Sequence, residues 1–336
     1  MNHSRALPRV VRLLAFAMAS LLGFAALGSG GEAHAGVTAK NLFSVKPLYV
    51  DPNSAAGDEA DELRVSDPAA AATLDKVAAG AQADWYGDWN PSSTLAQTVS
   101  ARAAEITAAG ALPVFVAYDI PMRDCGSYSG GGAASAAAYR AWIDEMAKGI
   151  GFSRKAVVIL EPDALAQLDC LPAAKQTERL SLLNYAVNRF YRLSGTAVYV
   201  DAGHADWIPA AEMADRLETA GVAKARGFAV NVSNFGTTAD QIGYADALAD
   251  LTGGKHAVID TSRNGLGPAS GPEAWCNPDG RALGAKPGSA TGDATIDAFV
   301  WVKHPGESDG ECGSGDPAAG TWWPEYAVGL GERATW

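Results

Sequence analysis

The feature that most constrains the fold is a recurring series of short apolar runs, rich in Val, Ile, Tyr and Phe. Eight such runs occupy residues 48–51, 83–87, 113–120, 156–160, 196–201, 227–232, 257–260 and 297–303. Ala-rich amphipathic stretches separate them, among them 93–109, 135–149, 177–193, 208–220 and 239–251. Apolar strands separated by helices are typical of a parallel sheet that is buried on both faces.

Two α/β architectures fit this alternation of apolar runs and amphipathic stretches. Seven or eight strand–helix units most simply close into a parallel (β/α) barrel. An open doubly wound sheet is the competing fold, but no G-x-G-x-x-G fingerprint follows any of the runs. The sequence therefore predicts an α/β fold, a (β/α) barrel of seven or eight strands with its active-site cleft at the carboxyl ends of the strands.

The N-terminus has the features of a secretory signal. Basic residues at Arg5, Arg9 and Arg12 precede an uncharged apolar stretch, residues 13–28, and then a small-x-small cleavage site at 33–35. This stretch is shorter than the roughly 20 residues that span a bilayer. We therefore expect a signal peptide at 1–35, a single catalytic domain at 36–336, a secreted protein and no membrane association after cleavage.

The charge balance limits the partners. A formal net charge of −12 argues against nucleic acid or anionic lipid as a binding partner and suits a neutral substrate. Four cysteines, an even number, predict two disulfides in an exported chain, with three pairings possible. Sequential pairing, 125 with 170 and 276 with 312, is preferred because each bond would tie neighbouring loops together.

Acidic residues crowd the ends of the apolar runs. They are Asp119, Asp124, Glu161, Asp163, Asp201, Asp260, Glu307 and Asp309. Carboxylates at five run ends would face one mouth of the barrel, and paired carboxylates are the groups that glycosidases use for acid–base catalysis. Close negative charges raise each other's pKa, so one acid can stay protonated near neutral pH.

Less specific interpretations exist for the same residues. Asp163 precedes Ala164 and Leu165 and could be a helix N-cap, while Asp201 and Asp260 could be ordinary turn residues. A cation site is a further alternative for an acidic cluster, but neither a D-x-D-x-D loop nor an H-E-x-x-H motif occurs. We expect no metal site and no cofactor.

Tryptophans add a clue to the substrate. Those at or after the run ends are Trp85, Trp89, Trp207, Trp275, Trp322 and Trp323. An indole ring offers a flat apolar surface to the C–H face of a sugar. Burial in the core is the alternative, but Trp207 and Trp275 lie in polar loop sequence, which favours exposure.

Six strings, in this order, resemble glycoside hydrolase family 6, the cellulases that include endoglucanases and cellobiohydrolases. They are YDIPMRDCG (118–126), VVILEPDALA (157–166), VYVDAGHADW (198–207), VNVSNF (230–235), DTSRNG (260–265) with a following WC, and VWVKHPGESDG (300–310). The resemblance spans most of the chain after the signal. It implies a distorted (β/α) barrel, inversion at the anomeric carbon and no cofactor.

The resemblance also implies roles for single residues. Asp163 would be the general acid, Asp124 would raise the pKa of Asp163 and help to position water, and Asp309 would be the candidate base. Tyr118 would favour a distorted sugar ring, and either Ser127 or Ser129 would hold the water. The residues implied to bind or orient glucose units are Trp85, Asp201, His204, Trp207, Asn231, Trp275, Lys303 and Glu307. The family's two loop disulfides would match Cys125–Cys170 and Cys276–Cys312.

The mode of cutting follows from loop length. Processive members of this family enclose the substrate with long loops, whereas segments 264–275 and 310–323 are short here. We therefore expect a monomeric endo-β-1,4-glucanase with an open cleft that hydrolyses internal bonds of a β-1,4-glucan chain. The alternatives are an exo-acting cellobiohydrolase, a hydrolase of another β-glucan such as a mixed-linkage one, and a non-catalytic sugar-binding barrel.

Overall fold

The computed structural model describes residues 40–271, 273–313 and 315–336. The predicted signal peptide, residues 1–35, lies outside the described residues. Within them, no helix is both long and apolar enough to cross a bilayer.

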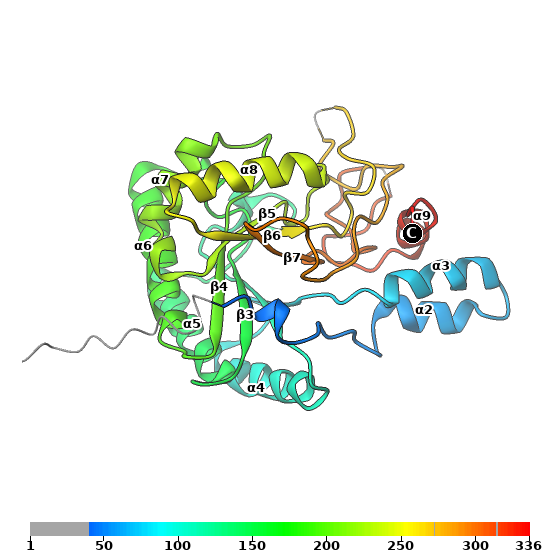
Figure 1. Ribbon diagram of the computed structural model, residues 1–336, viewed down its shortest axis with the longest axis horizontal. Helices are drawn as coiled ribbons and strands as arrows, with labels where there is room; N and C mark the ends of the chain where they lie inside the picture. The colour runs from blue at the N-terminus through cyan, green and yellow to red at the C-terminus, as the bar shows by residue number, and fades with distance from the viewer. Residues whose placement is uncertain (1–39, 272, 314) are drawn as a thin grey trace, which may run out of the picture. The chain divides into compact units, whose positions relative to one another are not determined.

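A single parallel sheet forms the centre of the fold (Figure 1). Its seven strands follow one another in chain order from β1 to β7, and each neighbouring pair is parallel. The strands are β1 Asp84–Gly87, β2 Val114–Tyr118, β3 Ala156–Leu160, β4 Thr196–Asp201, β5 Gly227–Val230, β6 His256–Asp260 and β7 Ile296–Val300. The predicted α/β barrel is confirmed, with seven strands.

Five helices follow strands β1 to β5 and cover the outside of the sheet. They are α4 Ser92–Ala108, α5 Ala136–Ile150, α6 Ala173–Tyr191, α7 Ala210–Thr219 and α8 Thr238–Leu251. Three of them begin directly after a proline, at Pro91, Pro172 and Pro209, a residue whose fixed φ suits entry into a helix. Each predicted amphipathic stretch is therefore a helix, with ends that differ by a few residues.

The sheet curls but does not close by regular strand pairing. Between its two edges there is one parallel bridge, Gln82 with Trp301, and the Ala83 N–H donates to the Trp301 carbonyl at 3.0 Å. Above this point the indole Nε1–H of Trp85 donates to the Val302 carbonyl at 2.7 Å. The β1 and β7 edges therefore meet near the start of β1 and separate toward the carboxyl end of the barrel, as in a distorted barrel.

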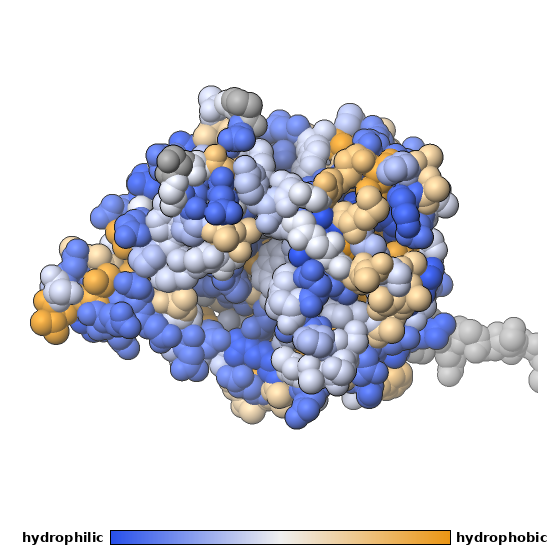
Figure 2. Space-filling view, turned by 180° about the vertical axis from the view of Figure 1, so that it is seen from behind, coloured by the Kyte–Doolittle hydropathy of each residue, from blue (hydrophilic) through white to orange (hydrophobic). Residues whose placement is uncertain are grey.

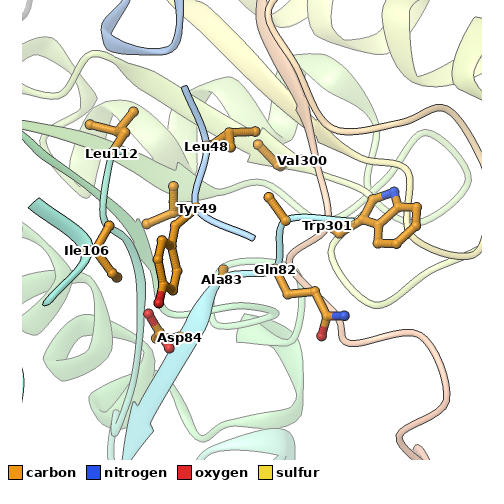
Figure 3. A pocket seen from close by; sticks show the side chains of 11 residues that line it. Leu48, Tyr49, Gln82, Ala83, Asp84, Ile106, Leu112, Val300 and Trp301 are labelled. Carbon is orange, nitrogen blue, oxygen red and sulfur yellow. The ribbon is translucent and has the colours of Figure 1, made fainter. Parts of the chain in front are cut away.

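The first apolar run, residues 48–51, is not a strand, so this part of the prediction is wrong. Only Leu48 forms a bridge, with Leu112. Pro47 and Pro52 flank the run and have no N–H to donate to a sheet. Figure 3 shows Leu48 and Tyr49 beside a cavity of about 10 Å³ that Ile106, Leu112 and Val300 also line, which has room for one water molecule at most.

Two layers of apolar residues hold the barrel together. One fills its interior and includes Val116, Ile159, Tyr199 and Val258, and the other lies between the sheet and helices α4 to α8. The alternating direction of side chains along each strand supplies both layers from one apolar run.

A third, smaller core lies beside the barrel. Helices α2 Ala55–Leu63, α3 Pro68–Ala78 and α9 Pro324–Glu332 come together at one side in Figure 1. Apolar residues of this group pack around the buried ring of Trp301, which follows β7. The candidate aromatics Trp322 and Trp323 belong here as partly buried packing residues and do not line the cleft.

Candidate active site

A cleft with a volume of about 1620 Å³ opens at the carboxyl ends of the strands. The predicted site residues on its surface are Trp85, Tyr118, Asp124, Asp163, His204, Trp207, Trp275, Lys303, Glu307 and Asp309. The face of the molecule in Figure 2 is hollowed near its centre and carries mainly hydrophilic residues. Carboxylates and aromatic rings from segments far apart in the sequence thus share one cavity.

Asp163 lies in the turn that follows β3, with a left-handed φ of 67°. Its side chain is half-buried, and no group among the described residues donates a hydrogen bond to its carboxyl group. Burial, and then the nearby charges of Asp201, Asp124 and Asp309, raise the pKa of Asp163 well above its usual value. This carboxyl group can therefore remain protonated near neutral pH.

The N-cap interpretation of Asp163 is wrong. The residues after it form turns, and the next helical segment is the short 3-10 helix Leu168–Cys170, whose N-cap residue is Gln167. Left-handed backbone is costly for most residues but is comparatively common for Asp. The turn aims the carboxyl group into the cleft instead of toward a helix terminus.

Asp124 comes from the neighbouring loop, after β2, and also has a left-handed φ of 53°. Its Oδ2 accepts the N–H of Ser129 at 3.0 Å, and its Oδ1 accepts the side-chain amide of Gln167 at 2.7 Å. The disulfide between Cys125 and Cys170 joins the same two loops. Asp124 is thus held at a fixed place beside the Asp163 loop.

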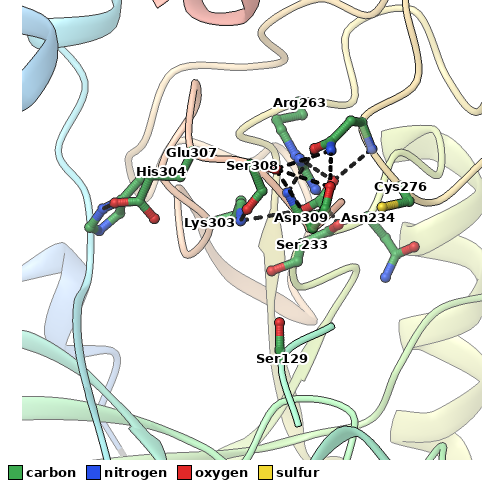
Figure 4. Close-up of polar contacts among 12 residues, drawn as sticks. Ser129, Ser233, Asn234, Arg263, Cys276, Lys303, His304, Glu307, Ser308 and Asp309 are labelled. Atoms are coloured by element: carbon green, nitrogen blue, oxygen red, sulfur yellow. Dashed lines mark hydrogen bonds and ion pairs between the residues drawn. The ribbon is translucent and has the colours of Figure 1, made fainter. Parts of the chain in front are cut away.

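Asp309 is buried among cationic and amide groups (Figure 4). Its Oδ2 accepts from Arg263 Nη1 at 2.7 Å and from the Asn277 N–H at 3.0 Å, and Lys303 Nζ lies 3.3 Å from its Oδ1. Burial by itself would raise the pKa of Asp309, but the charges of Arg263 and Lys303 outweigh it and lower the pKa below the usual value. At a pH at which Asp163 is protonated, Asp309 therefore carries a negative charge.

Tyr118, at the end of β2, lies in the floor of the cleft between two other side chains. Its ring makes an edge-on contact with Trp85, with 5.1 Å between ring centroids, and the Arg123 guanidinium lies 4.4 Å from its centroid. Arg123 is itself fixed by Asp88 at 3.1 Å and by the Tyr118 carbonyl at 2.7 Å. The ring therefore has little freedom to move within the cleft.

Other predicted residues form pairs along the walls. His204 and Trp207 have ring centroids 5.4 Å apart. His304 Nδ1 and Glu307 Oε1 lie 2.8 Å apart. Although burial would raise the pKa of Glu307, the neighbouring His304 lowers it, which keeps this carboxylate ionised.

The aromatic pair Tyr128 and Trp275 comes from the loops after β2 and β6. Their ring centroids lie 6.2 Å apart, and the residues are 44% and 43% exposed. These loops therefore approach each other without covering the rings from solvent.

Several of the strand-end acids do not face the cleft. Glu161 accepts the N–H groups of Asp119 and Ile120 after β2, and Asp201 accepts the N–H of Asp163 at 2.9 Å. Asp260 in the same way accepts from N–H groups after β5 and β7. These buried acids extend the hydrogen bonding between neighbouring strands into the loops that carry the cleft residues.

Two residues predicted to bind glucose units lie below the cleft surface. Asp201 is buried and holds the Asp163 backbone, as described above. Asn231 is 0% exposed, donates to the Asp260 carbonyl at 2.8 Å and accepts the Gly236 N–H at 3.0 Å. Both positions support the site from beneath and do not line the cavity.

Several residues of the site were not predicted from the sequence, above all the arginines. Arg123 and Arg263 occur inside the strings YDIPMRDCG and DTSRNG, but the sequence does not show which side chains they contact. Arg263 is fully buried against Asp309, which lies 46 positions further along the chain. Gln167, which holds Asp124, carried no signal that would distinguish it from a surface residue.

The predicted disulfide pairing is confirmed. Cys125 is bonded to Cys170 and Cys276 to Cys312, with Cα atoms 6.4 Å and 6.3 Å apart. Both bonds link loops at the cleft. Among the described residues, no cluster of three or more His, Cys, Asp or Glu side chains is arranged to bind a metal ion.

Comparison with known proteins places this barrel among sugar hydrolases. Residues 43–334 match the family described as glycosyl hydrolases family 6. Endoglucanase A of Cellulomonas fimi is 45% identical over 290 residues, which are 86% of this chain and 62% of that protein. This chain therefore spans less than two thirds of that relative's length.

Solved structures extend the similarity to three dimensions. The endoglucanase Cel6 of Mycobacterium tuberculosis, in complex with methyl-cellobiosyl-4-deoxy-4-thio-β-D-cellobioside, is 50% identical with a TM-score of 0.83, over 87% of this chain and 98% of that one. The catalytic core domain of the cellobiohydrolase Cel6A from Chaetomium thermophilum is 30% identical with a TM-score of 0.74, over 88% and 98% of the two chains.

Proposed function

The chain belongs to glycosyl hydrolase family 6, and we propose that it is an inverting endo-β-1,4-glucanase that hydrolyses internal bonds of cellulose or soluble β-glucan. The observation that carries this proposal is the contrast between two carboxyl groups of the cleft. Burial and neighbouring charges raise the pKa of Asp163, whereas Arg263 and Lys303 lower that of Asp309. Two carboxyl groups with opposite protonation states are the requirement of glycoside hydrolysis.

Asp163 is the general acid in this mechanism and protonates the oxygen of the leaving glucose unit. As the glycosidic bond breaks, positive charge develops on the sugar ring and is stabilised by the surrounding carboxylates. Asp124 supports the protonated form of Asp163 through its negative charge. Tyr118, backed by Trp85 and Arg123, fills the space beneath the ring and favours a distorted sugar.

Water attacks from the opposite face of the ring, which inverts the anomeric carbon. Asp309 is the candidate base that takes the proton, either directly or through a second water. In Figure 4 the Ser129 side chain points toward Asp309. The Ser129 N–H donates a hydrogen bond to Asp124. We therefore propose Ser129 as the serine that holds the attacking water.

The remaining cleft residues bind the glucan chain. Trp85, Trp207 and Trp275 offer apolar faces to sugar rings. Lys303, Glu307 and His204 supply donors and acceptors for hydroxyl groups. Asp201 and Asn231 contribute indirectly, because they fix the loops on which the contacting residues lie.

Internal cutting, rather than cutting from chain ends, is supported by the openness of the cleft. Tyr128 and Trp275 remain exposed where the two loops approach each other. The most similar relatives reported above are named endoglucanases. The alternative is an exo-acting cellobiohydrolase, the activity for which the more distant structural neighbour is named.

We also propose that the protein acts outside the cell as a monomer. Two disulfides suit an oxidising compartment. Detection of the mature protein in culture medium, with an N-terminus near residue 36, tests secretion, and light scattering tests the oligomeric state.

The mechanism is tested by proton NMR of cello-oligosaccharide hydrolysis with wild type and Asp163→Asn. We expect the α-anomer to appear first and the rate to fall at least about 100-fold in the variant, because the general acid is lost. Initial β-anomer would contradict inversion. No hydrolysis of any β-glucan by wild type would contradict the enzymatic proposal and favour a sugar-binding barrel.

The mode of cutting is tested separately with a soluble cellulose derivative. An endo-acting enzyme lowers the viscosity strongly for each reducing end released, since each internal cut shortens a chain greatly. A slow fall in viscosity per reducing end would favour the exo-acting alternative.

A further inference from the structure

One exposed aromatic residue of the cleft has no role in the mechanism above. Trp89 lies in the turn between β1 and α4, lines the cleft and is 53% exposed. Contact between a large apolar ring and water is unfavourable, and the free energy decreases when another molecule covers the ring. Its position inside the cleft, and not on an outer surface, indicates that the covering molecule is the substrate.

The turn that carries Trp89 is rigid. The Asn90 N–H donates to the Gly87 carbonyl at 2.8 Å, and the Gly87 N–H donates back to the Asn90 side chain at 3.1 Å. The six-membered part of the Trp89 ring lies against Gly87 so closely that a Cβ there would come within 2.5 Å of it. The absence of a side chain at position 87 is therefore what allows the ring to lie in this place.

Arg123 fixes the ring from a second direction. Its guanidinium carbon lies 5.4 Å from the Trp89 ring centroid and 4.4 Å from that of Tyr118. The same guanidinium donates to Asp88, beside Trp89, and to the carbonyls of Tyr118 and Ser129. One buried cation thus sets the position of Trp89 relative to Tyr118, the proposed sugar-distorting residue.

Residues of β1 and α4 also line the cleft. They are Asp84, Tyr86, Thr98 and Arg102. Arg102 is held by Asp84 at 3.0 Å and by Glu105 at 3.1 Å. An aromatic face that shares a cavity with fixed polar groups is the combination that binds a sugar ring by its C–H face and its hydroxyls.

We propose that Trp89 is the platform of a further glucosyl-binding subsite at the β1 end of the cleft, beyond Trp85. This subsite rests on the proposed β-glucanase function and defines the length of glucan that the cleft recognises. A glucan chain long enough to reach Trp89 gains one further stacking contact, whereas a shorter chain that ends at Trp85 does not contact Trp89. Because the ring is already fixed before the substrate binds, little conformational entropy is lost on contact.

The proposal is tested by measuring kcat/KM for a series of cello-oligosaccharides with wild type, Trp89→Ala and Trp89→Phe. We expect Trp89→Ala to lower kcat/KM about tenfold for the longest oligosaccharides and to leave the shortest hydrolysed ones nearly unchanged. Trp89→Phe keeps a flat ring and should retain most of the dependence on length. Phe152→Ala is a matched control, because Phe152 is 63% exposed and does not line the cleft.

An equal loss at every substrate length would overturn the subsite and assign Trp89 a structural role. Unchanged kinetics at every length would also overturn the subsite. Binding of cellohexaose to Asp163→Asn, with and without Trp89→Ala, separates this outcome from failure of the proposed function. We expect weaker binding in the double variant even where no hydrolysis is measured. If wild type hydrolyses no glucan but Trp89→Ala still weakens binding, the subsite stands and the enzymatic proposal fails.

Discussion

The chemistry of the cleft depends on small differences between residues of the same type. Asp163 and Asp309 are both carboxylic acids near the mouth of one barrel, but their surroundings move their pKa values in opposite directions. Asp163 has other carboxylates around it, and Asp309 has an arginine and a lysine. The proposed acid and the proposed base are therefore distinguished by their neighbours and not by residue type.

Asp124→Asn is expected to shift the alkaline limb of the pH–activity profile to lower pH. The charge of Asp124 helps to raise the pKa of Asp163. The proposed mechanism requires the protonated form of Asp163, so activity should fall as the pH rises through that pKa. Without the negative charge at position 124, the ionised form of Asp163 is less disfavoured, and the pKa of Asp163 decreases.

The measurement is kcat/KM against pH for wild type and Asp124→Asn. The Asn oxygen can still accept the Ser129 N–H, and the Asn NH2 group can donate to Gln167 Oε1 once the Gln167 amide is flipped, so the loop should keep its conformation. Asp169→Asn is a suitable control, since Asp169 also lines the cavity but is not among the charges that raise the pKa of Asp163. An alkaline limb at the wild-type position in Asp124→Asn would exclude Asp124 as a pKa modulator.

At the scale of elements, the helices outside the barrel hold the loops inside the cleft. Arg179 of α6 is buried and donates to the Pro121 and Met122 carbonyls at 3.1 Å and 2.7 Å. It also reaches the Ala164 carbonyl at 3.4 Å. One guanidinium therefore connects the Asp124 loop with the Asp163 loop, two segments that belong to different strands.

Arg179→Met is expected to lower kcat at least about tenfold with little change in KM, because displacement of the proposed general acid, Asp163, by a fraction of an ångström would slow the chemical step. Unpaired buried carbonyls should also cost about 1–3 kcal/mol of stability. Steady-state kinetics and thermal unfolding check both effects.

Arg189→Met is the matched control on the same helix, because Arg189 pairs with the more exposed Asp144. It should leave kcat unchanged. Loss of stability in Arg179→Met without any change in kcat would indicate that Arg179 only supports the fold.

At the scale of the whole molecule, the buried acids make stability depend on pH. Burial is the main cause that raises the pKa of Glu161 to about 8, and of Asp119 and Asp201 to about 7. In the unfolded chain these groups titrate near pH 4. Between those values the folded protein binds more protons than the unfolded one, so stability falls as the pH rises.

We therefore expect Tm to decrease from about pH 5 to pH 8, with each such carboxyl contributing up to about 1.4 kcal/mol per pH unit. Glu161→Gln should flatten this slope, because the amide cannot ionise yet can still accept the N–H groups after β2. Thermal unfolding across this pH range tests the prediction. A Tm that rises over the same range in wild type would contradict the burial of these groups as acids.

The sequence by itself determined the class of fold and most of the composition of the cleft. Apolar runs separated by amphipathic stretches are local patterns, and seven of the eight runs are strands of the barrel. The motifs placed Asp124, Asp163 and Asp309 at the ends of strands, where all three line one cavity. The cysteine pairing was also predicted correctly.

Only the tertiary structure decided which strand-end acids face the cleft and which support the backbone. Glu161 and Asp163 are two residues apart, yet one is buried against the loop after β2 and the other opens into the cavity. The left-handed turn and the contact with Asp201, which lies 38 positions further along the chain, make that difference. Local patterns show where a strand ends, but the direction of a side chain depends on partners that are distant in sequence.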